Sequence, residues 1–139
     1  MTASRLFLSE IESCIIKKND FAIETTLAGR SYLKLIKRLQ LANWEIKLIY
    51  LALPNVEMSK KRVAERVLHG GHNIPNKDIV RRYPRSLNNL LNKFSHKVDS
   101  CICFMNLGKK PELIFQQHSN NRTIVNKQYY ELLENGAKK

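Results

Sequence analysis

The residues whose types best suit ligand binding form one short stretch, in which a glycine pair is followed by clustered arginines. Residues 70–75 read Gly-Gly-His-Asn-Ile-Pro, and Arg81, Arg82 and Arg85 follow soon after them. Adjacent glycines let the backbone turn sharply. The guanidinium group of arginine is always charged, and its planar fork of N–H donors matches phosphate oxygens. The stretch therefore predicts a mobile element that closes over a phosphate group.

A second candidate site lies earlier in the chain, at residues 24–30, which read Glu-Thr-Thr-Leu-Ala-Gly-Arg. It falls between an expected strand at 21–23 and an expected helix, and ligands of open parallel sheets bind beyond the carboxyl ends of the strands. There Glu24, Thr25 and Thr26 can hold a sugar hydroxyl, and the following helix N-terminus favours an anion. A second interpretation is that the two threonines only cap the helix, with the glutamate on the surface.

Composition and charge narrow the class of ligand. The chain has 139 residues, enough for one domain, and 43% of them are hydrophobic, enough for a core. It carries 24 lysines and arginines against 12 aspartates and glutamates, a formal net charge of +12. Such a charge favours a polyanionic ligand: a nucleotide, a nucleotide-sugar or a nucleic acid. A solvated basic surface is the alternative. Because the basic residues are spread along the chain, a disordered nucleic-acid-binding arm is not expected.

The three cysteines indicate free thiols in a reducing, cytoplasmic setting. Cys101 and Cys103 are two positions apart, so they share one face of a strand, and they lack a second ligand pair at zinc spacing. We therefore expect Cys101 and Cys103 to be core cysteines and no metal site. No apolar run reaches the roughly twenty residues of a membrane span, and the partly acidic N-terminus differs from a signal peptide.

The elements that must position these residues alternate between helices and strands. Helices are expected at 3–18, 30–42, 56–68, 76–94 and 127–134, and strands at 21–23, 45–53, 101–105, 113–115 and 122–125. Pro75 and Asn76 suit a helix start with the asparagine as cap, and Pro84 predicts a break in that helix. The continuous apolar run at 48–53 is typical of a strand buried on both faces. The alternation predicts an α/β fold with a largely parallel sheet.

Two segments match, in order and spacing, the motifs of one known family. Residues 21–30 read Phe-Ala-Ile-Glu-Thr-Thr-Leu-Ala-Gly-Arg, and residues 62–87 contain two Arg-Val pairs, the glycine pair and Arg-Arg-Tyr-Pro-Arg-Ser-Leu. Together they resemble the zeta-toxin-like kinases, in the subgroup described as predicted nucleoside-triphosphate-dependent kinases, over about residues 4–114. The resemblance implies one domain over residues 1–139 with a P-loop-kinase-like three-layer fold, a mostly parallel sheet and a lid region at about 66–90.

The same resemblance implies roles for particular residues. Zeta-toxin kinases use ATP and Mg²⁺ to phosphorylate a sugar hydroxyl of UDP-N-acetylglucosamine. The residues implied to bind the acceptor are Glu24, Thr26 and Arg30. The residues implied to bind phosphate are Arg66, Arg81, Arg82 and Arg85. Of these, Arg66 and Arg82 would clamp the transferring phosphate and neutralise charge in the transition state. His72 would shape the hinge or touch the ligand, and the first of these roles is preferred.

The chain departs from the family where ATP should bind. A P-loop needs Gly-x-x-x-x-Gly-Lys-Ser/Thr, because its backbone N–H groups wrap the phosphates and its lysine reaches them. The only Gly-Lys pair is Gly108-Lys109, and neither the preceding glycine nor the following hydroxyl residue accompanies it. Where the family commonly has Asp-Asn-Ser, only Asn106 remains. We therefore expect a truncated kinase that starts after its first strand, P-loop and general-base aspartate, and that does not bind ATP and Mg²⁺ tightly alone.

The missing strand predicts a partner. An apolar sheet edge invites pairing with another chain, so we expect either a homodimer or docking of a separately encoded P-loop fragment. The family also implies an antitoxin for some members. Two functions follow: the acceptor-binding and lid portion of a kinase acting on a small hydroxyl acceptor, or a non-catalytic basic module. No membrane partner is expected, and a nucleic acid is expected only for the basic module.

Overall fold

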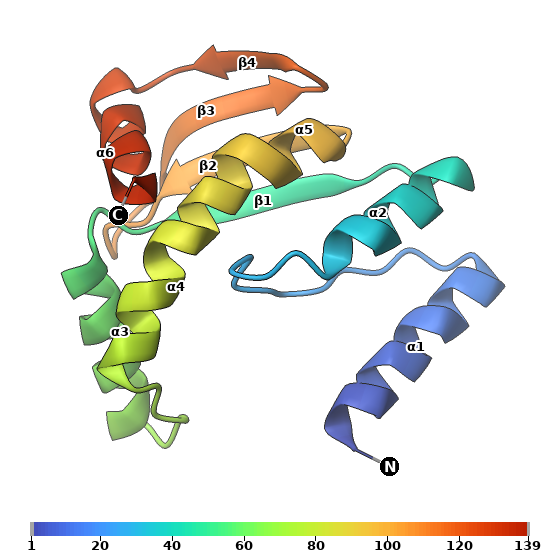
Figure 1. The fold of residues 1–139 in the computed structure, drawn as a ribbon, viewed down its shortest axis with the longest axis horizontal. Helices are drawn as coiled ribbons and strands as arrows, with labels where there is room; N and C mark the ends of the chain where they lie inside the picture. The colour runs from blue at the N-terminus through green and yellow to red at the C-terminus, as the bar shows by residue number, and fades with distance from the viewer. Residues whose placement is uncertain (1, 139) are drawn as a thin grey trace.

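The computed structural model describes residues 2–138 as a four-stranded mixed sheet with helices packed against one of its faces (Figure 1). The helices are α1 (Ala3–Lys17), α2 (Tyr32–Leu41), α3 (Val56–Leu68), α4 (Asn76–Asn89), α5 (Ser95–Lys97) and α6 (Lys127–Ala137). The strands are β1 (Lys47–Ala52), β2 (Ser100–Met105), β3 (Glu112–His118) and β4 (Asn121–Ile124). A π-helical turn, Leu90–Phe94, joins α4 to α5. The α/β class expected from the alternating pattern is confirmed, and no helix of the described residues is both long and apolar enough to cross a membrane.

The sheet has the order β1-β2-β3-β4, and only β1 and β2 are parallel. The expectation of a largely parallel sheet is wrong, since β3 is antiparallel to both β2 and β4. The connections explain the difference. Residues 106–111 and 119–120 are too short to carry a chain back across the sheet, as a parallel crossover requires. Short connections of this kind make hairpins instead.

The expected strand at 21–23 does not form. The segment has no regular structure, and the ring of Phe21 packs edge-on against Trp44 with 5.7 Å between the ring centroids. Within residues 2–138, strand β1 pairs with β2 alone and is therefore an edge strand of the sheet. A short apolar run adds little backbone pairing, and here side-chain packing holds the segment instead.

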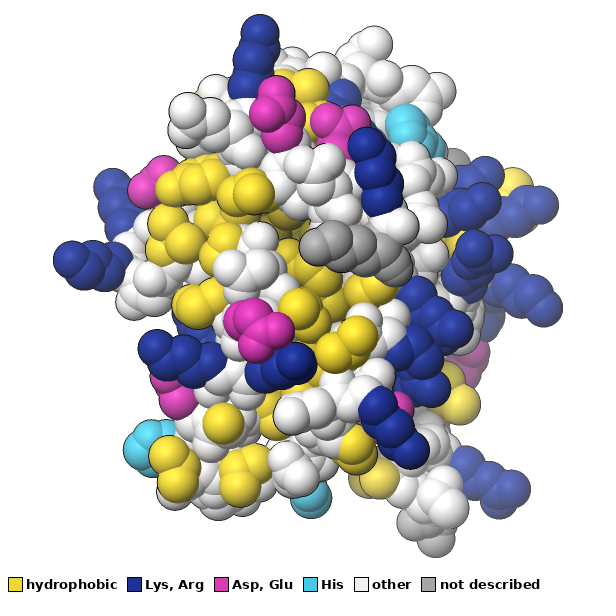
Figure 2. Space-filling view, turned by 60° about the vertical axis from the view of Figure 1, so that its left-hand side comes forward, with side chains coloured by type: hydrophobic (Ala, Val, Ile, Leu, Met, Phe, Trp, Pro, Cys, Tyr) yellow, Lys and Arg dark blue, Asp and Glu magenta, His cyan; other side chains and the backbone are white. Residues whose placement is uncertain are grey.

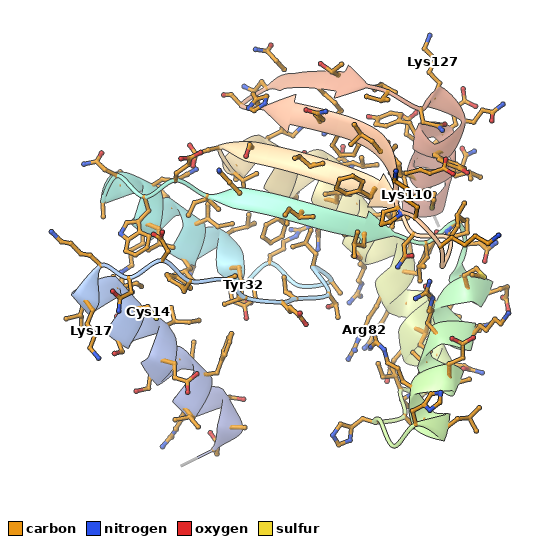
Figure 3. The ribbon with its side chains drawn as sticks, turned by 180° about the vertical axis from the view of Figure 1, so that it is seen from behind. Cys14, Lys17, Tyr32, Arg82, Lys110 and Lys127 are labelled. Atoms are coloured by element: carbon orange, nitrogen blue, oxygen red, sulfur yellow. The ribbon has the colours of Figure 1, made fainter. Side chains whose placement is uncertain are left out.

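Strand β1 is also not buried on both faces, contrary to expectation. Its burial alternates: Ala52 is 1% exposed, whereas Ile49 is 68% and Leu51 is 55% exposed. Figure 3, which views the molecule from behind, shows the strands in front with no helix covering them. The described residues therefore form two layers rather than the three implied by the resemblance. In the turned view of Figure 2, hydrophobic side chains gather into a patch with lysine and arginine side chains at its borders.

The core lies between the sheet and the helix that runs from α4 through α5. Cys101, Cys103 and Met105 point from β2 toward Leu90 and Phe94, and all five side chains are at most 2% exposed. The expectation of core cysteines is confirmed for the β2 pair. Burial raises the pKa of Cys101 to about 11 and raises that of Cys103 further, so both thiols stay protonated at neutral pH.

Two details of α4 differ from expectation. The helix continues through Pro84 without a break, because Ile79 before it and Leu87 after it are both buried and hold the helix in place. Asn76 is the first helical residue, not the cap. The cap position is taken by Pro75, whose carbonyl accepts the N–H of Asp78 at 2.9 Å and closes the first turn.

Candidate functional site

The two motifs that stand out in the sequence are joined in the structure. Ser86 Oγ donates a hydrogen bond of 2.6 Å to the carbonyl oxygen of Thr26. One helical turn further along α4, Asn89 Nδ2 donates to the carbonyl oxygens of Leu27, at 2.8 Å, and Gly29, at 3.3 Å. Two side chains of α4 that follow the arginines therefore hold the backbone of the segment 24–30, which we call the acceptor loop.

The acceptor loop has a defined local structure. The Oγ1 atom of Thr25 accepts the N–H of Leu27 at 3.2 Å, and that of Thr26 accepts the N–H of Ala28 at 3.4 Å. Leu27 has a φ of +61°, in the left-handed region, and its side chain is buried at 3% exposure. Helix α2 begins later, after Ser31, so the alternative that the two threonines cap this helix is wrong. They close turns within the loop instead.

The three implied acceptor-binding residues all lie on the surface of this loop. Glu24, Thr26 and Arg30 are exposed. Among residues 2–138, the side chains of Glu24 and Arg30 make no hydrogen bond and no ion pair. A carboxylate, a hydroxyl and a guanidinium group are therefore available to a ligand from one short, anchored segment.

The arginines of α4 are not equivalent. Arg82, Ser86 and Asn89 are spaced i, i+4, i+7 and so share the helix face that holds the acceptor loop. Arg82 is half-buried and carries no ion pair within the described chain, and Figure 3 shows it on the flank of α4. Arg81 instead pairs with Asp78 at 3.3 Å, and Arg85 is exposed. Of the three arginines of α4, Arg82 is therefore the one that shares a helix face with the loop-holding groups.

Helices α3 and α4 form a hairpin whose turn contains the glycine pair (Figure 1). Gly70 has a φ of +87°, and the N–H of Gly71 donates to the carbonyl oxygen of Arg66 at 2.7 Å, which ends α3. The side chain of Arg66 is exposed and borders a surface hollow of about 470 Å³ on α3. His72 is exposed in the turn. Within residues 2–138, no hydrogen bond or ion pair joins the Arg66 side chain to the acceptor loop.

Two tyrosines were missed by sequence reasoning. Tyr50 Oη lies 2.6 Å from Ser86 Oγ, and Tyr83 Oη donates to the carbonyl oxygen of Leu53 at 2.8 Å. Burial raises the pKa of Tyr83 to about 12, and burial also raises the pKa of Tyr50, so both stay protonated donors at neutral pH. They tie α4 to β1 and to its carboxyl end. The i, i+4, i+7 spacing of Arg82, Ser86 and Asn89 was the available signal for the anchors on α4.

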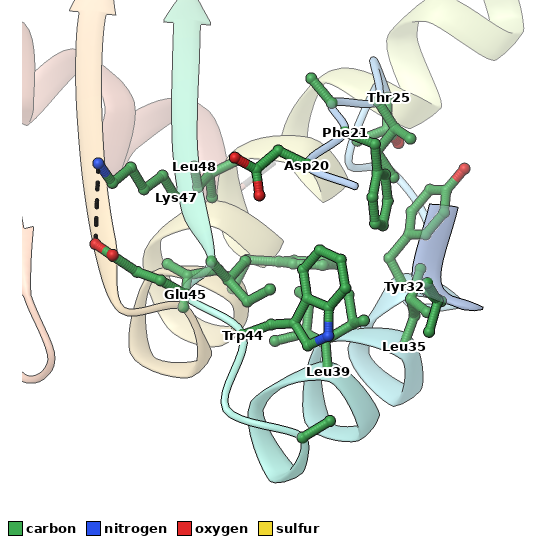
Figure 4. A pocket seen from close by; sticks show the side chains of 18 of the residues that line it. Asp20, Phe21, Thr25, Tyr32, Leu35, Leu39, Trp44, Glu45, Lys47 and Leu48 are labelled. Carbon is green, nitrogen blue, oxygen red and sulfur yellow. Dashed lines mark ion pairs between the residues drawn. The ribbon is translucent and has the colours of Figure 1, made fainter. Parts of the chain in front are cut away.

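A groove of about 920 Å³ runs beside the acceptor loop, between α2 and the start of β1 (Figure 4). Its walls are mostly apolar and include Phe21, Tyr32, Leu39 and Trp44. Thr25 is among the polar groups at its border, so the groove is continuous with the loop. A volume of this size lies in the range of ligand pockets, which typically span about 300–1,000 Å³.

The part of the chain that the structure describes shows neither a metal-ligand cluster nor a phosphate-wrapping loop at the Gly-Lys pair. Within residues 2–138, no three His, Cys, Asp or Glu side chains lie close enough to hold a metal ion. The Gly108 segment forms an Asx turn, in which Asn106 Oδ1 accepts the N–H of Gly108 at 3.2 Å, rather than a phosphate-wrapping loop. Within residues 2–138, the Gly-Lys pair therefore does not form the loop that a Walker A segment would provide.

Comparisons with family models, with curated protein sequences and with solved structures found no match to this chain. The resemblance to the zeta-toxin-like kinases therefore stays a prediction that rests on the two motifs.

Proposed function

We propose that this chain is the acceptor-binding and lid portion of a zeta-toxin-like, ATP-dependent kinase that acts on a nucleotide-sugar or another small hydroxyl acceptor. One observation carries the proposal: Ser86 and Asn89, which follow the arginines on α4, hold the backbone of the acceptor loop. Two motifs that suit different parts of one ligand are thereby fixed side by side. Such a pairing has a clear use when one ligand carries both hydroxyl and phosphate groups.

The proposed roles follow from the chemistry of each side chain. The Glu24 carboxylate accepts hydrogen bonds from sugar hydroxyls, and the Thr26 hydroxyl can both donate and accept. Arg30 and Arg82 supply charge-assisted hydrogen bonds to the phosphates of the same ligand. Arg66, Arg81 and Arg85 add positive charge from the α3–α4 hairpin, which favours association with a polyanion.

In this proposal the phosphoryl donor is held by a P-loop-bearing segment, within a longer polypeptide or as a separate fragment, and the present residues alone do not catalyse transfer. ATP and Mg²⁺ would bind to that segment. The uncovered sheet face, with Ile49 and Leu51 exposed, and the unpaired edge of β1 support a docked partner. A second copy of the chain is the other candidate partner, and an antitoxin is a third.

The acceptor site is tested by thermal unfolding with UDP-N-acetylglucosamine. The wild-type chain should gain thermal stability in its presence, and Glu24→Ala should abolish the gain. Glu131→Ala, which changes an exposed glutamate on α6, is the matched control and should keep it. No shift for the wild-type chain would argue against the proposal. Micromolar binding of ATP to the isolated chain would contradict the missing phosphate cradle.

A second candidate function is a non-catalytic basic module for a nucleotide-sugar or a nucleic acid. It is favoured by the exposed basic side chains of the α3–α4 hairpin, which are Lys61, Arg66, Lys77, Arg81 and Arg85. Binding to DNA or RNA that weakens steeply with salt, without an effect of Glu24→Ala, would support this function over the first. A gain in thermal stability with a nucleotide-sugar that depends on Glu24 would support the kinase portion over a module that binds nucleic acid.

A further inference from the structure

The backbone at Leu27 adopts a conformation that its side chain does not favour. A φ of +61° is uncommon for residues other than glycine, asparagine and aspartate, because Cβ approaches the backbone. Such conformations persist only where the surroundings over-determine them, and they concentrate at functional sites. The loop contains a glycine two residues later, yet the left-handed position is occupied by a buried leucine. The fold must therefore supply groups that hold this turn.

Those groups come from one face of α4. Asn89 is 5% exposed, and its amide nitrogen donates to the carbonyl oxygens on both sides of Ala28. Ser86 is 8% exposed and donates to the carbonyl oxygen of Thr26. An amide group is needed at position 89, because a carboxylate of the same shape accepts hydrogen bonds but cannot donate them.

The same face carries Arg82, and α4 itself is tied to the sheet at this level. Tyr83 donates to the carbonyl oxygen of Leu53, at the carboxyl end of β1, and Tyr50 meets Ser86. The segment from Arg82 to Asn89 is thus bonded to both the acceptor loop and β1. Any hinge of the lid region must then lie N-terminal to Arg82, on the side of the glycine pair.

We propose that Asn89 and Ser86 are positioning residues, which hold the left-handed turn at Leu27 and so fix the acceptor loop relative to Arg82. The hydroxyl-binding and anion-binding groups then form one preformed unit. Less free energy is therefore spent on ordering the loop when a ligand binds. The ligand in this inference rests on the proposed function, whereas the holding of the loop does not.

The test replaces Asn89 by aspartate and measures amide hydrogen exchange. Asn89→Asp removes the donor and keeps the shape, and Asn88→Asp makes the same change at an exposed neighbour. Exchange at the amides of Leu27 and Ala28 should rise by about tenfold or more in Asn89→Asp, as expected when buried carbonyls lose their donors. The amide of Cys103 in β2 and the control variant should change little. Unchanged exchange in the loop, or an equal rise across the chain, would overturn the inference.

Ligand affinity supplies the second arm. In the folded protein, well below its melting temperature, Asn89→Asp should weaken binding of UDP-N-acetylglucosamine by about fivefold or more, since the ligand must then order the loop. A purely structural role would lower the melting temperature and leave this affinity unchanged, and that result would overturn the inference. If the wild-type chain does not bind this nucleotide-sugar, the proposed function fails, while the exchange arm still decides whether the loop is held. If Asn89→Asp does not fold, Ser86→Ala carries both arms.

Discussion

The hydroxyl groups of Tyr50 and Ser86 lie 2.6 Å apart, which joins the edge strand β1 to helix α4. Ser86 uses its own hydroxyl hydrogen to donate to the carbonyl oxygen of Thr26 at 2.6 Å, so Tyr50 is the donor of the first bond. Three segments that are distant in the sequence are thereby connected through two hydroxyl groups. Because both hydroxyls are largely shielded from water, the loss of the Ser86 hydroxyl leaves that of Tyr50 without a partner, whereas Ser86 keeps Thr26 when the Tyr50 hydroxyl is lost.

This relationship predicts a non-additive pair of substitutions. Ser86→Ala should cost about 1–3 kcal/mol of stability, because it leaves the Tyr50 hydroxyl and the Thr26 carbonyl unsatisfied. Tyr50→Phe should cost less, because Ser86 still donates to Thr26. In the Ser86→Ala background, Tyr50→Phe removes an already orphaned hydroxyl and should cost close to nothing. Urea unfolding of the wild type, the two single variants and the double variant measures this coupling. Additive costs would contradict the network.

The local elements could be predicted because their signals are local. Helix α3 was expected at 56–68 and is observed there, since Asn55 caps its first turn and the glycine pair ends it. The alternation of Cys101 and Cys103 correctly predicted a shared buried face. The direction of β3 and the exposure of β1 could not be predicted in this way. They depend on which strands pair and on which layers are present, not on the residues of one segment.

The candidate site was only partly predictable. Its exposed chemical groups, such as Glu24 and Arg82, are recognisable by residue type. The groups that hold them are not, because the bond from Ser86 to Thr26 spans 60 residues of sequence. A serine or asparagine on a helix has many ordinary roles, and only the folded chain distinguishes an anchor from a surface side chain.

The glycine pair gives a second prediction. Gly70→Ala should destabilise the chain by about 1 kcal/mol or more, because alanine does not favour a φ of +87°. Gly71→Ala should also be costly, since its new Cβ would lie 2.9 Å from the carbonyl oxygen of Arg66. Gly29→Ala is the matched control, with no atom within 4 Å of the new Cβ and no left-handed φ. Thermal unfolding compares the three variants, and equal losses would contradict the special geometry of the turn.

The thiols give a third prediction. Burial raises the pKa of Cys101 and Cys103, so the reactive thiolate is scarce and is also inaccessible. In the native chain, iodoacetamide should modify Cys14, which is half-buried on α1, well before either β2 cysteine. In denaturant all three cysteines should react alike. Mass spectrometry of digested samples identifies the modified positions. Rapid modification of Cys103 in the native chain would show that β2 is not protected as the structure describes.

The uncovered sheet face gives the last prediction. Sheet pairing sets Ile49 beside Ile102 and Leu51 beside Phe104, so apolar side chains from two strands adjoin on the face without helices. An exposed apolar face beside an unpaired strand edge favours association, here with a second copy when no other partner is present. The wild-type chain should therefore associate as its concentration rises, as measured by size-exclusion chromatography with light scattering.

Matched variants distinguish association through this face from nonspecific association. Ile49→Lys and Leu51→Lys should each keep the chain monomeric at small cost in stability, because both side chains already contact water. Ile16→Lys, which changes a 78% exposed residue on α1, should leave association unchanged. A wild-type chain that stays monomeric at every concentration would remove the second copy as a partner. Association that persists in both β1 variants would place the interface elsewhere, because a lysine at the centre of a buried apolar contact carries a large desolvation cost.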